Sequence, residues 1–370
     1  MIPLLDLVAQ YQTIKTEIDA AIQDVLANGK FILGPHEHAF EEEAAAYLGV
    51  RHAIGVASGT DALVIALRAA GVGPGDEVIV PAYSFFATAG CVLTVGARPV
   101  FVDVEPKTYL MDLGQLEKAL SGRTKAILPV HLYGQPADMN EIMAFARAHG
   151  LKVIEDNAQA FGATYHGKKN GAIGDLGCLS FFPSKNLGGY GDGGMVTTND
   201  DALAEKVRML RVHGWKKKYF PEMLGYNSRL DEIQAAVLRV KLKHLDGWNT
   251  RRGTLARTYT ARLGEMGIQT PVVAPGRTHV FHLYIIRAPR REAFQQRLKE
   301  LEVASEVYYP QPLHLAAPCR ALGWREGSLP VSEAASHETL ALPLYPELTE
   351  EQVETIFRAL AEARQEVGVR

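Results

Sequence analysis

The sequence predicts an α/β fold in which a large domain, with a mostly parallel sheet sandwiched by helices, precedes a smaller α+β domain. From about residue 50 onward, short apolar runs alternate with helix-like stretches, the pattern of parallel strands buried on both faces. The 370 residues include 47% hydrophobic and 22% charged side chains, an ordinary globular composition. A chain of this length favours about two domains and can bury a sizeable core.

Hydrophobic periodicity places the first elements. Apolar residues spaced three or four apart, from Ile14 to Leu26, predict an amphipathic helix that stops at Asn28-Gly29. Strands of the sheet are expected at residues 52–57, 77–80, 99–104, 125–130, 152–155, 176–182 and 195–197. Helices between them are expected at residues 60–70, 138–149 and 200–213.

A long amphipathic stretch at residues 230–245 closes this part of the chain. Gly247-Trp248-Asn249 follows it and marks the expected boundary. The sequence therefore predicts a large domain over residues 1–245, which includes the N-terminal helix, and a small α+β domain over residues 246–370.

Signals for strands are fewer in the predicted small domain, where residues 282–286 and 306–309 are the best candidates. Thr349 and Gln352 form a capping-box pattern, which predicts the start of a final helix. The apolar stripe expected on that helix consists of Val353, Ile356, Leu360 and Ala361.

Charge and composition limit the function classes. With 39 Lys+Arg against 42 Asp+Glu, the net charge of −3 argues against a nucleic-acid partner. No apolar run is long enough for a membrane span, and the first residues lack a secretory signal pattern.

Cys91, Cys178 and Cys319 fit no disulfide framework, so we expect packing residues in a reducing cytoplasm. No metal site is expected, because His36 and His38 have no third ligand nearby.

Ser58-Gly59-Thr60 follows the first expected strand and begins a helix. Free N–H groups at a helix N-terminus, together with two hydroxyl groups, can cradle a phosphate, although an ordinary N-cap explains the same residues. The segment matches neither the GxxxxGK[ST] nor the GxGxxG pattern, which weakens the nucleotide-hydrolase and dinucleotide-dehydrogenase interpretations.

Two further strand ends carry ionisable side chains. Asp156 ends an apolar strand and is partly desolvated there, so it either caps a turn or has a cationic or hydrogen-bonding partner. Lys185 precedes a loop, residues 188–194, in which five of seven residues are glycine. A partly buried lysine has a lowered pKa and can form a Schiff base with a carbonyl, whereas a surface lysine in a flexible loop has no such role.

Ligands of open α/β sheets bind outside the carboxyl ends of the strands, so these three features are expected at one edge of the sheet. Together they match the needs of pyridoxal phosphate. Its phosphate requires a site such as a helix N-terminus, its pyridine nitrogen requires an acidic partner, and its aldehyde requires a lysine. Each feature has a structural explanation when taken alone, but the combination favours this cofactor.

Short motifs are spread over essentially the whole chain: IPLLDL (2–7), ILGP (32–35), SGTDAL (58–63), GPGDEVIVP (73–81), HLYG (131–134), IED (154–156), SFFPSK (180–185), GDGG (191–194) and NSRLD (227–231). In this order and spacing they resemble the sugar aminotransferases of the DegT/DnrJ/EryC1/StrS type. Those proteins are fold-type I enzymes that depend on pyridoxal phosphate, so the resemblance implies that architecture here.

The resemblance also implies roles around the cofactor ring. Lys185 would bind the cofactor as a Schiff base and then shuttle the proton. Asp156 would pair with the pyridine nitrogen, Gln159 would hydrogen-bond the ring hydroxyl, and Phe85 would stack on the ring. Asn157 stands where the family usually has a small residue, a departure that bears on hydrogen bonding near the ring.

The phosphate would be held by Gly59, Thr60 and Ser180. Asn227 would reach the phosphate of the neighbouring subunit, which implies a homodimer with shared active sites. No partner beyond a second copy and the small-molecule substrates is expected.

Three residues are candidates for contact with substrate. Arg229 follows the predicted phosphate ligand Asn227 and would meet a substrate anion, or else form an ion pair with Asp231 or Glu232. The segment 308–314 resembles one that contacts substrate in relatives acting at sugar C3, which makes Tyr309 and His314 candidates.

The implied reaction moves an amino group from L-glutamate to a keto group of a nucleoside-diphosphate-linked sugar, for amino-sugar biosynthesis. The segments around Lys185 and Asp192 resemble members acting at C3, so a 3-keto-6-deoxyhexose is favoured over a C4 acceptor. A sugar deoxygenase of the same family is disfavoured because some of its members carry histidine in place of this lysine. A non-catalytic protein of this fold predicts the loss of one or more residues that contact the cofactor, and Lys185, Asp156, Gln159 and Ser180 are all present.

Overall fold

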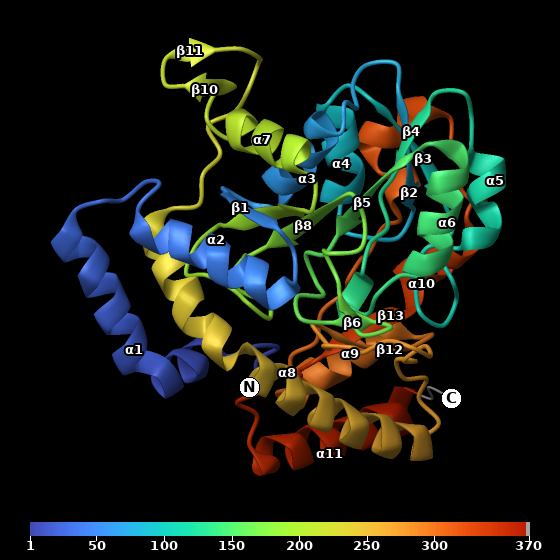
Figure 1. Ribbon diagram of the computed structural model, residues 1–370. Coiled ribbons are helices and arrows are strands. Elements are labelled where there is room, and N and C mark those ends of the chain that lie inside the picture. Colours follow the sequence, from blue (N-terminus) through green and yellow to red (C-terminus); the bar gives the residue numbers. More distant parts are fainter. Residues whose placement is uncertain (368–370) are drawn as a thin grey trace.

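The computed structural model describes residues 1–367. Its centre is a seven-stranded sheet covered by helices (Figure 1). Along the sheet the strands follow the order β1 (His52–Val56), β9 (Gly194–Thr198), β8 (Leu176–Ser180), β5 (Lys152–Asp156), β4 (Thr124–Ile127), β2 (Glu77–Pro81) and β3 (Arg98–Val102). Strand β9 is antiparallel to both neighbours, and every other adjacent pair is parallel. The predicted α/β fold with a mostly parallel sheet is confirmed.

The α-helices of the described residues are α1 (Leu7–Asn28), α2 (Pro35–Leu48), α3 (Gly59–Ala69), α4 (Ala87–Thr94), α5 (Leu116–Ala119), α6 (Met139–His149), α7 (Asp201–Leu210), α8 (Glu232–Glu265), α9 (Arg291–Glu300), α10 (Pro330–Glu338) and α11 (Glu350–Val367). Short 3₁₀ helices occur at η1 (Leu113–Gln115), η2 (Leu132–Gly134), η3 (Leu313–Leu315) and η4 (Ala317–Leu322). Smaller two-stranded sheets pair β6 (Thr164–Tyr165) with β7 (Lys168–Lys169), β10 (Trp215–Lys217) with β11 (Phe220–Pro221), and β12 (Tyr284–Arg287) with β13 (Thr339–Leu342).

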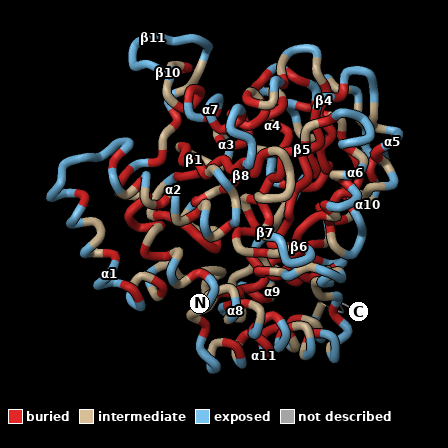
Figure 2. The backbone as a smooth tube through the Cα atoms, in the orientation of Figure 1, coloured by how far each residue is buried: buried red, intermediate tan, exposed pale blue. Residues whose placement is uncertain are grey.

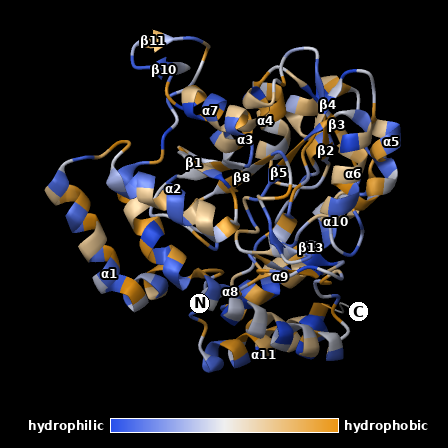
Figure 3. Ribbon diagram, in the orientation of Figure 1, coloured by the Kyte–Doolittle hydropathy of each residue, from blue (hydrophilic) through white to orange (hydrophobic). Residues whose placement is uncertain are grey.

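Helices cover both faces of the central sheet, because its strands are apolar on both sides. Successive residues of a strand point to opposite faces, and in β2 every residue is buried. Val78 and Val80 pack in one apolar cluster with α3, α4 and α7, whereas Ile79 packs in a second cluster with α5 and α6. Figure 2 shows the buried backbone concentrated in these strands, and Figure 3 shows their apolar character.

The N-terminal helix forms as predicted and ends at Gly29, which has a φ of 62° in the left-handed region that favours glycine. Ile14 and Ile18 pack against Val237 and Val240 of α8. The predicted apolar face is too wide, since Leu26 is 49% exposed.

The chain does not break at residues 247–249, because helix α8 continues through them and ends only at Glu265. Its second half joins a separate apolar cluster with α9, α11, β12 and β13, which lies below the central sheet in Figure 1. The division into domains at residues 1–245 and 246–370 stays a prediction. The structure shows that one continuous helix, α8, crosses this boundary.

The C-terminal elements confirm some expectations and correct others. Residues 306–309 are not a strand, and the strand that pairs with β12 is β13, which the sequence did not reveal. The capping box is confirmed: the Thr349 N–H donates to Gln352 Oε1 at 2.9 Å, and the Gln352 N–H donates to Thr349 Oγ1 at 3.2 Å. None of the helices described is long and apolar enough to cross a membrane.

Candidate active site

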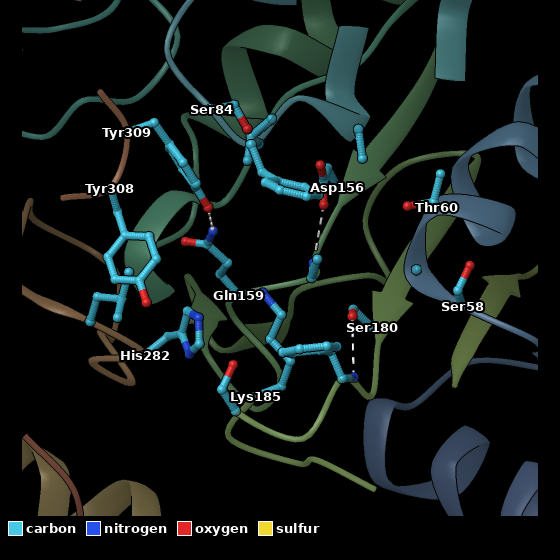
Figure 4. A pocket seen from close by; sticks show the side chains of 18 of the residues that line it. Ser58, Thr60, Ser84, Asp156, Gln159, Ser180, Lys185, His282, Tyr308 and Tyr309 are labelled. Atoms are coloured by element: carbon cyan, nitrogen blue, oxygen red, sulfur yellow. Dashed lines mark hydrogen bonds between the residues drawn. The ribbon is translucent and has the colours of Figure 1, made fainter. Parts of the chain in front are cut away.

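A cavity of about 440 Å³ opens where β5 and β8 end and α3 begins. Asp156 and Ser180 line it from the ends of their strands, Lys185 lines it from the loop after β8, and Gly59 and Thr60 line it from the first turn of α3 (Figure 4). Residues from the C-terminal part of the chain complete the wall. The three features that the sequence placed at one sheet edge therefore meet in one cavity.

The start of α3 combines a cap with a close approach of two backbone segments. Ser58 is the N-cap, and its Oγ accepts a hydrogen bond from the Asp61 N–H at 3.1 Å. A Cβ atom added to Gly59 would lie 2.6 Å from Ser180 Cβ, so only glycine fits there. N–H groups of the first helical turn have no partner within the helix. This end of the cavity can therefore hold an anion such as a phosphate.

The carboxyl group of Asp156 is buried beneath the cavity. Its Oδ2 accepts a hydrogen bond from Thr88 Oγ1 at 3.1 Å, and its Oδ1 accepts one from the Ala158 N–H at 3.2 Å. Burial raises the pKa of Asp156, while these hydrogen bonds and the charge of Lys185 act in the opposite direction. A cation or a protonated ring nitrogen beside this carboxyl group would keep it ionised.

Lys185 follows β8 and enters the cavity from the other side. Burial lowers the pKa of its ammonium group to about 8, and the charge of Asp156 partly opposes that shift. A substantial fraction of the amine is therefore neutral and nucleophilic near neutral pH. The glycine-rich loop allows this placement, because a Cβ atom at Gly188 would lie 2.3 Å from the Pro183 carbonyl oxygen.

Gln159 connects the sheet edge to the C-terminal wall of the cavity. Its Oε1 accepts a hydrogen bond from the Tyr133 N–H at 2.7 Å, and its Nε2 donates to the Tyr309 hydroxyl at 2.8 Å. The rings of Phe85 and Tyr309 lie 5.9 Å apart between centroids. Phe85 is 56% exposed, so one side of its ring is free to cover a planar ligand.

A buried tyrosine holds the segment that carries Tyr309. The Tyr83 hydroxyl donates to the Tyr308 carbonyl at 2.8 Å, accepts from the Tyr309 N–H at 2.9 Å, and shares a hydrogen bond with Thr339 Oγ1 at 2.6 Å. Tyr133 also donates its hydroxyl to the Tyr308 carbonyl. These bonds fix the position of Tyr309 above the cavity.

Comparison with known proteins agrees with this geometry. The family model of the DegT/DnrJ/EryC1/StrS aminotransferases matches residues 12–361. The chain belongs to this aminotransferase family. A Geobacillus stearothermophilus relative, named a pleiotropic regulatory protein, is 54% identical with 98% of each chain covered. An Acidithiobacillus ferrooxidans relative, named a UDP-N-acetyl-3-dehydro-α-D-glucosamine 3-aminotransferase, is 49% identical with 96% of each chain covered.

A solved structure has the same fold. The crystal structure of DesV from S. venezuelae, in complex with a ketimine intermediate, matches with a TM-score of 0.95 and 46% identity, covering 98% of each chain. The chain is thus a fold-type I aminotransferase that depends on pyridoxal phosphate. Its cavity fits that cofactor, because Gly59, Thr60 and Ser180 line it together at the start of α3 and the buried Asp156 has no cationic hydrogen-bond partner among the described residues.

The structure places two candidates of this aminotransferase outside the main cavity. Asn227 and Arg229 line a second, open hollow, which they share with Thr60 and Asp192. Arg229 forms neither of the ion pairs considered for it, since Glu232 instead accepts the N–H groups of Gly34, His36 and Glu37, and no described carboxylate pairs with Arg229. Both side chains lie next to the phosphate cradle, on its outer side.

His314 is not brought to the cavity, which argues against the predicted contact with substrate. It is buried and shares a hydrogen bond with Glu333 Oε1 at 3.0 Å. Asn157 also faces away from the cavity, because its Nδ2 donates to the Asn170 carbonyl at 3.0 Å. The departure at Asn157 therefore does not reach the ring site.

Sequence reasoning missed several lining residues, among them Leu4, Arg252 and His282. Arg252 lies inside α8, and His282 lies two residues before β12. No local pattern distinguishes them from ordinary core or surface residues. The run IPLLDL was noticed as a family motif, and its Leu4 now has a place in the wall of the cavity.

Proposed function

We propose that this aminotransferase transfers the amino group of L-glutamate to C3 of a nucleoside-diphosphate-linked 3-keto sugar, with a 3-keto-6-deoxyhexose as the favoured acceptor. The observation that carries the proposal is that Lys185, with its pKa lowered to about 8, faces the cavity that also contains Asp156 and the N-terminus of α3. The name of the Acidithiobacillus relative supports amination at C3.

Each residue has a task that follows from its position. When bound, pyridoxal phosphate supplies an electron sink that makes the donor C–H acidic. The N–H groups at Gly59 and Thr60 and the Ser180 hydroxyl bind the phosphate. Asp156 holds a proton at the pyridine nitrogen by charge. Lys185 Nζ, when neutral, would take the proton from the donor carbon as a general base and, as its conjugate acid, would deliver that proton to the cofactor carbon that keeps the amino group.

The remaining wall residues orient the ligands. Phe85 covers the ring with its exposed face. Gln159 is already fixed by its bonds to Tyr133 and Tyr309, so its amide needs little reordering to reach the ring hydroxyl. Tyr309 lies on the side of the cavity away from the phosphate cradle, where we place the sugar.

Absorbance spectroscopy tests the first half of the reaction. The purified enzyme loaded with pyridoxal phosphate should be yellow, and L-glutamate alone should convert it to the colourless pyridoxamine form. A 3-keto sugar nucleotide should then restore the colour, whereas a 4-keto isomer should not. A loaded enzyme that ignores glutamate would refute the donor, and restoration by the 4-keto isomer would refute the regiochemistry.

Matched lysine variants provide the control. Lys185→Ala should abolish the colour change. Lys169→Ala should leave it unchanged, because Lys169 is a half-buried lysine that bonds Tyr47 and the Gly162 carbonyl outside the cavity. Equal effects of the two substitutions would show that the loss at Lys185 is not specific.

We further propose a homodimer in which Asn227 completes the phosphate site of the partner. Asn227 is exposed in the single chain, and apolar side chains near it are uncovered: Phe31 is 47% exposed and Leu224 is 80% exposed. Light scattering should give twice the 40.5 kDa of one chain. We place the enzyme in the cytoplasm, which suits its three free, buried thiols.

Mixing two inactive variants tests the shared site. In a heterodimer of Lys185→Ala and Asn227→Ala chains, a site shared between subunits leaves one active site with neither substitution. Activity should therefore reappear on mixing and refolding the two variants together. If both residues act within one chain, every site keeps one lesion and no activity returns.

A further inference from the structure

Arg252 is a buried cation in the wall of the active-site cavity. Arg252 lies in α8 and is only 3% exposed. It lines the same cavity as Lys185. Burial lowers the pKa of its guanidinium to about 10, so it stays charged at neutral pH. The other arginines of the described chain do not line this cavity.

The hydrogen bonds of Arg252 leave part of its guanidinium free. Nη1 donates to the Leu344 carbonyl at 2.7 Å and to the Phe281 carbonyl at 3.5 Å. No salt bridge joins Arg252 to a described carboxylate, and Glu347 acts on it only through its charge. A buried cation without a paired anion is costly, so such a residue normally has an anionic ligand or partner.

The neighbouring side chains of His282 and Lys185 do not provide a permanent positive charge in place of Arg252. His282 lies near both Lys185 and Arg252, and burial with their charges keeps its pKa well below the ordinary value, so it is neutral. Its Nδ1 has no hydrogen-bond partner, although the residue is only 9% exposed. Lys185 is assigned to the proton transfer. Arg252 is therefore the permanent positive charge that the described wall offers to a second anion.

We propose that Arg252 binds a carboxylate of the amino-acid donor, with neutral His282 as a neighbouring hydrogen-bonding group. This assignment rests on the proposed function. The phosphate of the cofactor is served by the N-terminus of α3. The diphosphate of the sugar nucleotide is attached at C1, across the sugar ring from the reacting C3, so the anion that must lie beside the reacting carbon is the carboxylate of the donor. The donor must bring a carboxylate next to the amine that would replace Lys185 on the cofactor. A guanidinium with free donors matches a carboxylate in geometry as well as in charge.

The test uses the loaded enzyme and L-glutamate without any sugar. Arg252→Met should raise the glutamate concentration needed for half-maximal conversion to the pyridoxamine form by about tenfold to a hundredfold, the range for losing a charged hydrogen bond. Cofactor occupancy, read from absorbance, should not change. The return step with a 3-keto sugar nucleotide that has no carboxylate should keep its rate.

Calorimetry provides a readout that needs no catalysis. Glutarate, a dicarboxylate without an amine, should bind the loaded wild-type enzyme and lose about tenfold or more in affinity in the variant. Arg252→Gln is the second variant, because its amide can still donate to the Leu344 carbonyl if the methionine variant fails to fold. Arg291→Met is the matched control: Arg291 is also buried and donates to the Ser336 carbonyl, but lies outside the cavity.

The outcomes separate the two proposals. If glutamate converts the wild-type enzyme and the Arg252 variants respond to glutamate and glutarate as the wild type does, the assignment of Arg252 is refuted while the proposed function stands. A parallel loss in the glutamate and sugar steps would also refute it, in favour of a purely structural role. If glutamate does not convert the wild-type enzyme, the proposed donor fails and the assignment fails with it.

Discussion

Replacing Tyr83 by phenylalanine removes one hydroxyl that holds the Tyr308–Tyr309 segment over the active site. Tyr83 is fully buried, and its hydroxyl makes hydrogen bonds to Tyr308, Tyr309 and Thr339. Two of the partners keep another bond in the variant. The Tyr308 carbonyl still accepts from Tyr133, and Thr339 Oγ1 still donates to the Ala335 carbonyl at 2.9 Å.

The Tyr309 N–H loses the partner that the structure gives it. Leaving a fully buried donor unpaired costs about 1–3 kcal/mol, and this hydrogen bond is partly buried. We therefore expect the free energy of unfolding to fall by about 2 kcal/mol, which is about a 30-fold change in the unfolding equilibrium. Because the freed segment carries Tyr309, the bond from Gln159 to the Tyr309 hydroxyl should weaken as well. The overall kcat/KM for the keto sugar should then fall.

Urea denaturation of the apoenzyme, followed by tryptophan fluorescence, measures the free energy of unfolding of each variant. Tyr259→Phe is the control, since Tyr259 is equally buried but donates its hydroxyl only to the Pro343 carbonyl, at 2.9 Å and away from the cavity. It should lose about 1 kcal/mol and keep its kcat/KM. If Tyr83→Phe is no less stable than this control, or if it loses stability while its kcat/KM is unchanged, the positioning role of Tyr83 is refuted.

Three further predictions concern the cofactor site and the last helix. The rate at which the apoenzyme reacts with pyridoxal phosphate should rise with pH and reach half of its plateau near the Lys185 pKa of about 8, because only the neutral amine attacks; a flat profile between pH of about 6 and 9 would contradict the lowered pKa. Gly59→Ala should cost about 1–3 kcal/mol of stability and weaken cofactor binding in a fluorescence titration, because its methyl group would overlap Ser180, and unchanged affinity would show that the cradle has spare room. Thr349→Ala should lower the free energy of unfolding by about 1 kcal/mol without affecting cofactor binding, since it removes one half of the capping box on α11.

Local patterns in the sequence are sufficient for the central sheet and for the cofactor end of the site. Strands buried on both faces appear as apolar runs, so β1, β5 and β8 fall within a few residues of their predicted places. Asp156 is the last residue of β5, and Lys185 lies in the loop that follows β8. Parallel topology then brings the ends together, which is why residues far apart in sequence could be assigned to one cavity.

The substrate end of the site depends on contacts that no local pattern encodes. Arg252 and His282 reach the cavity only because the C-terminal part of the chain packs against the sheet edge. His314 was expected there from its place in a segment, but the segment turns into η3 and buries the side chain beside Glu333. Residues 306–309 form no strand: Glu306 makes a single bridge to Ala341 of β13, and Tyr308 and Tyr309 line the active site instead of extending the sheet.

The continuity of α8 has a mechanical consequence. At 34 residues the helix is about 50 Å long, and it joins the sheet layer to the C-terminal elements without an interruption at which the two could pivot. It also touches the catalytic loop, since Asn186 Nδ2 donates to Asn249 Oδ1 at 2.7 Å. A rod of this kind keeps Lys185 and Arg252 at a constant separation, so substrate entry must be governed by surface loops while the two walls of the site stay in fixed register.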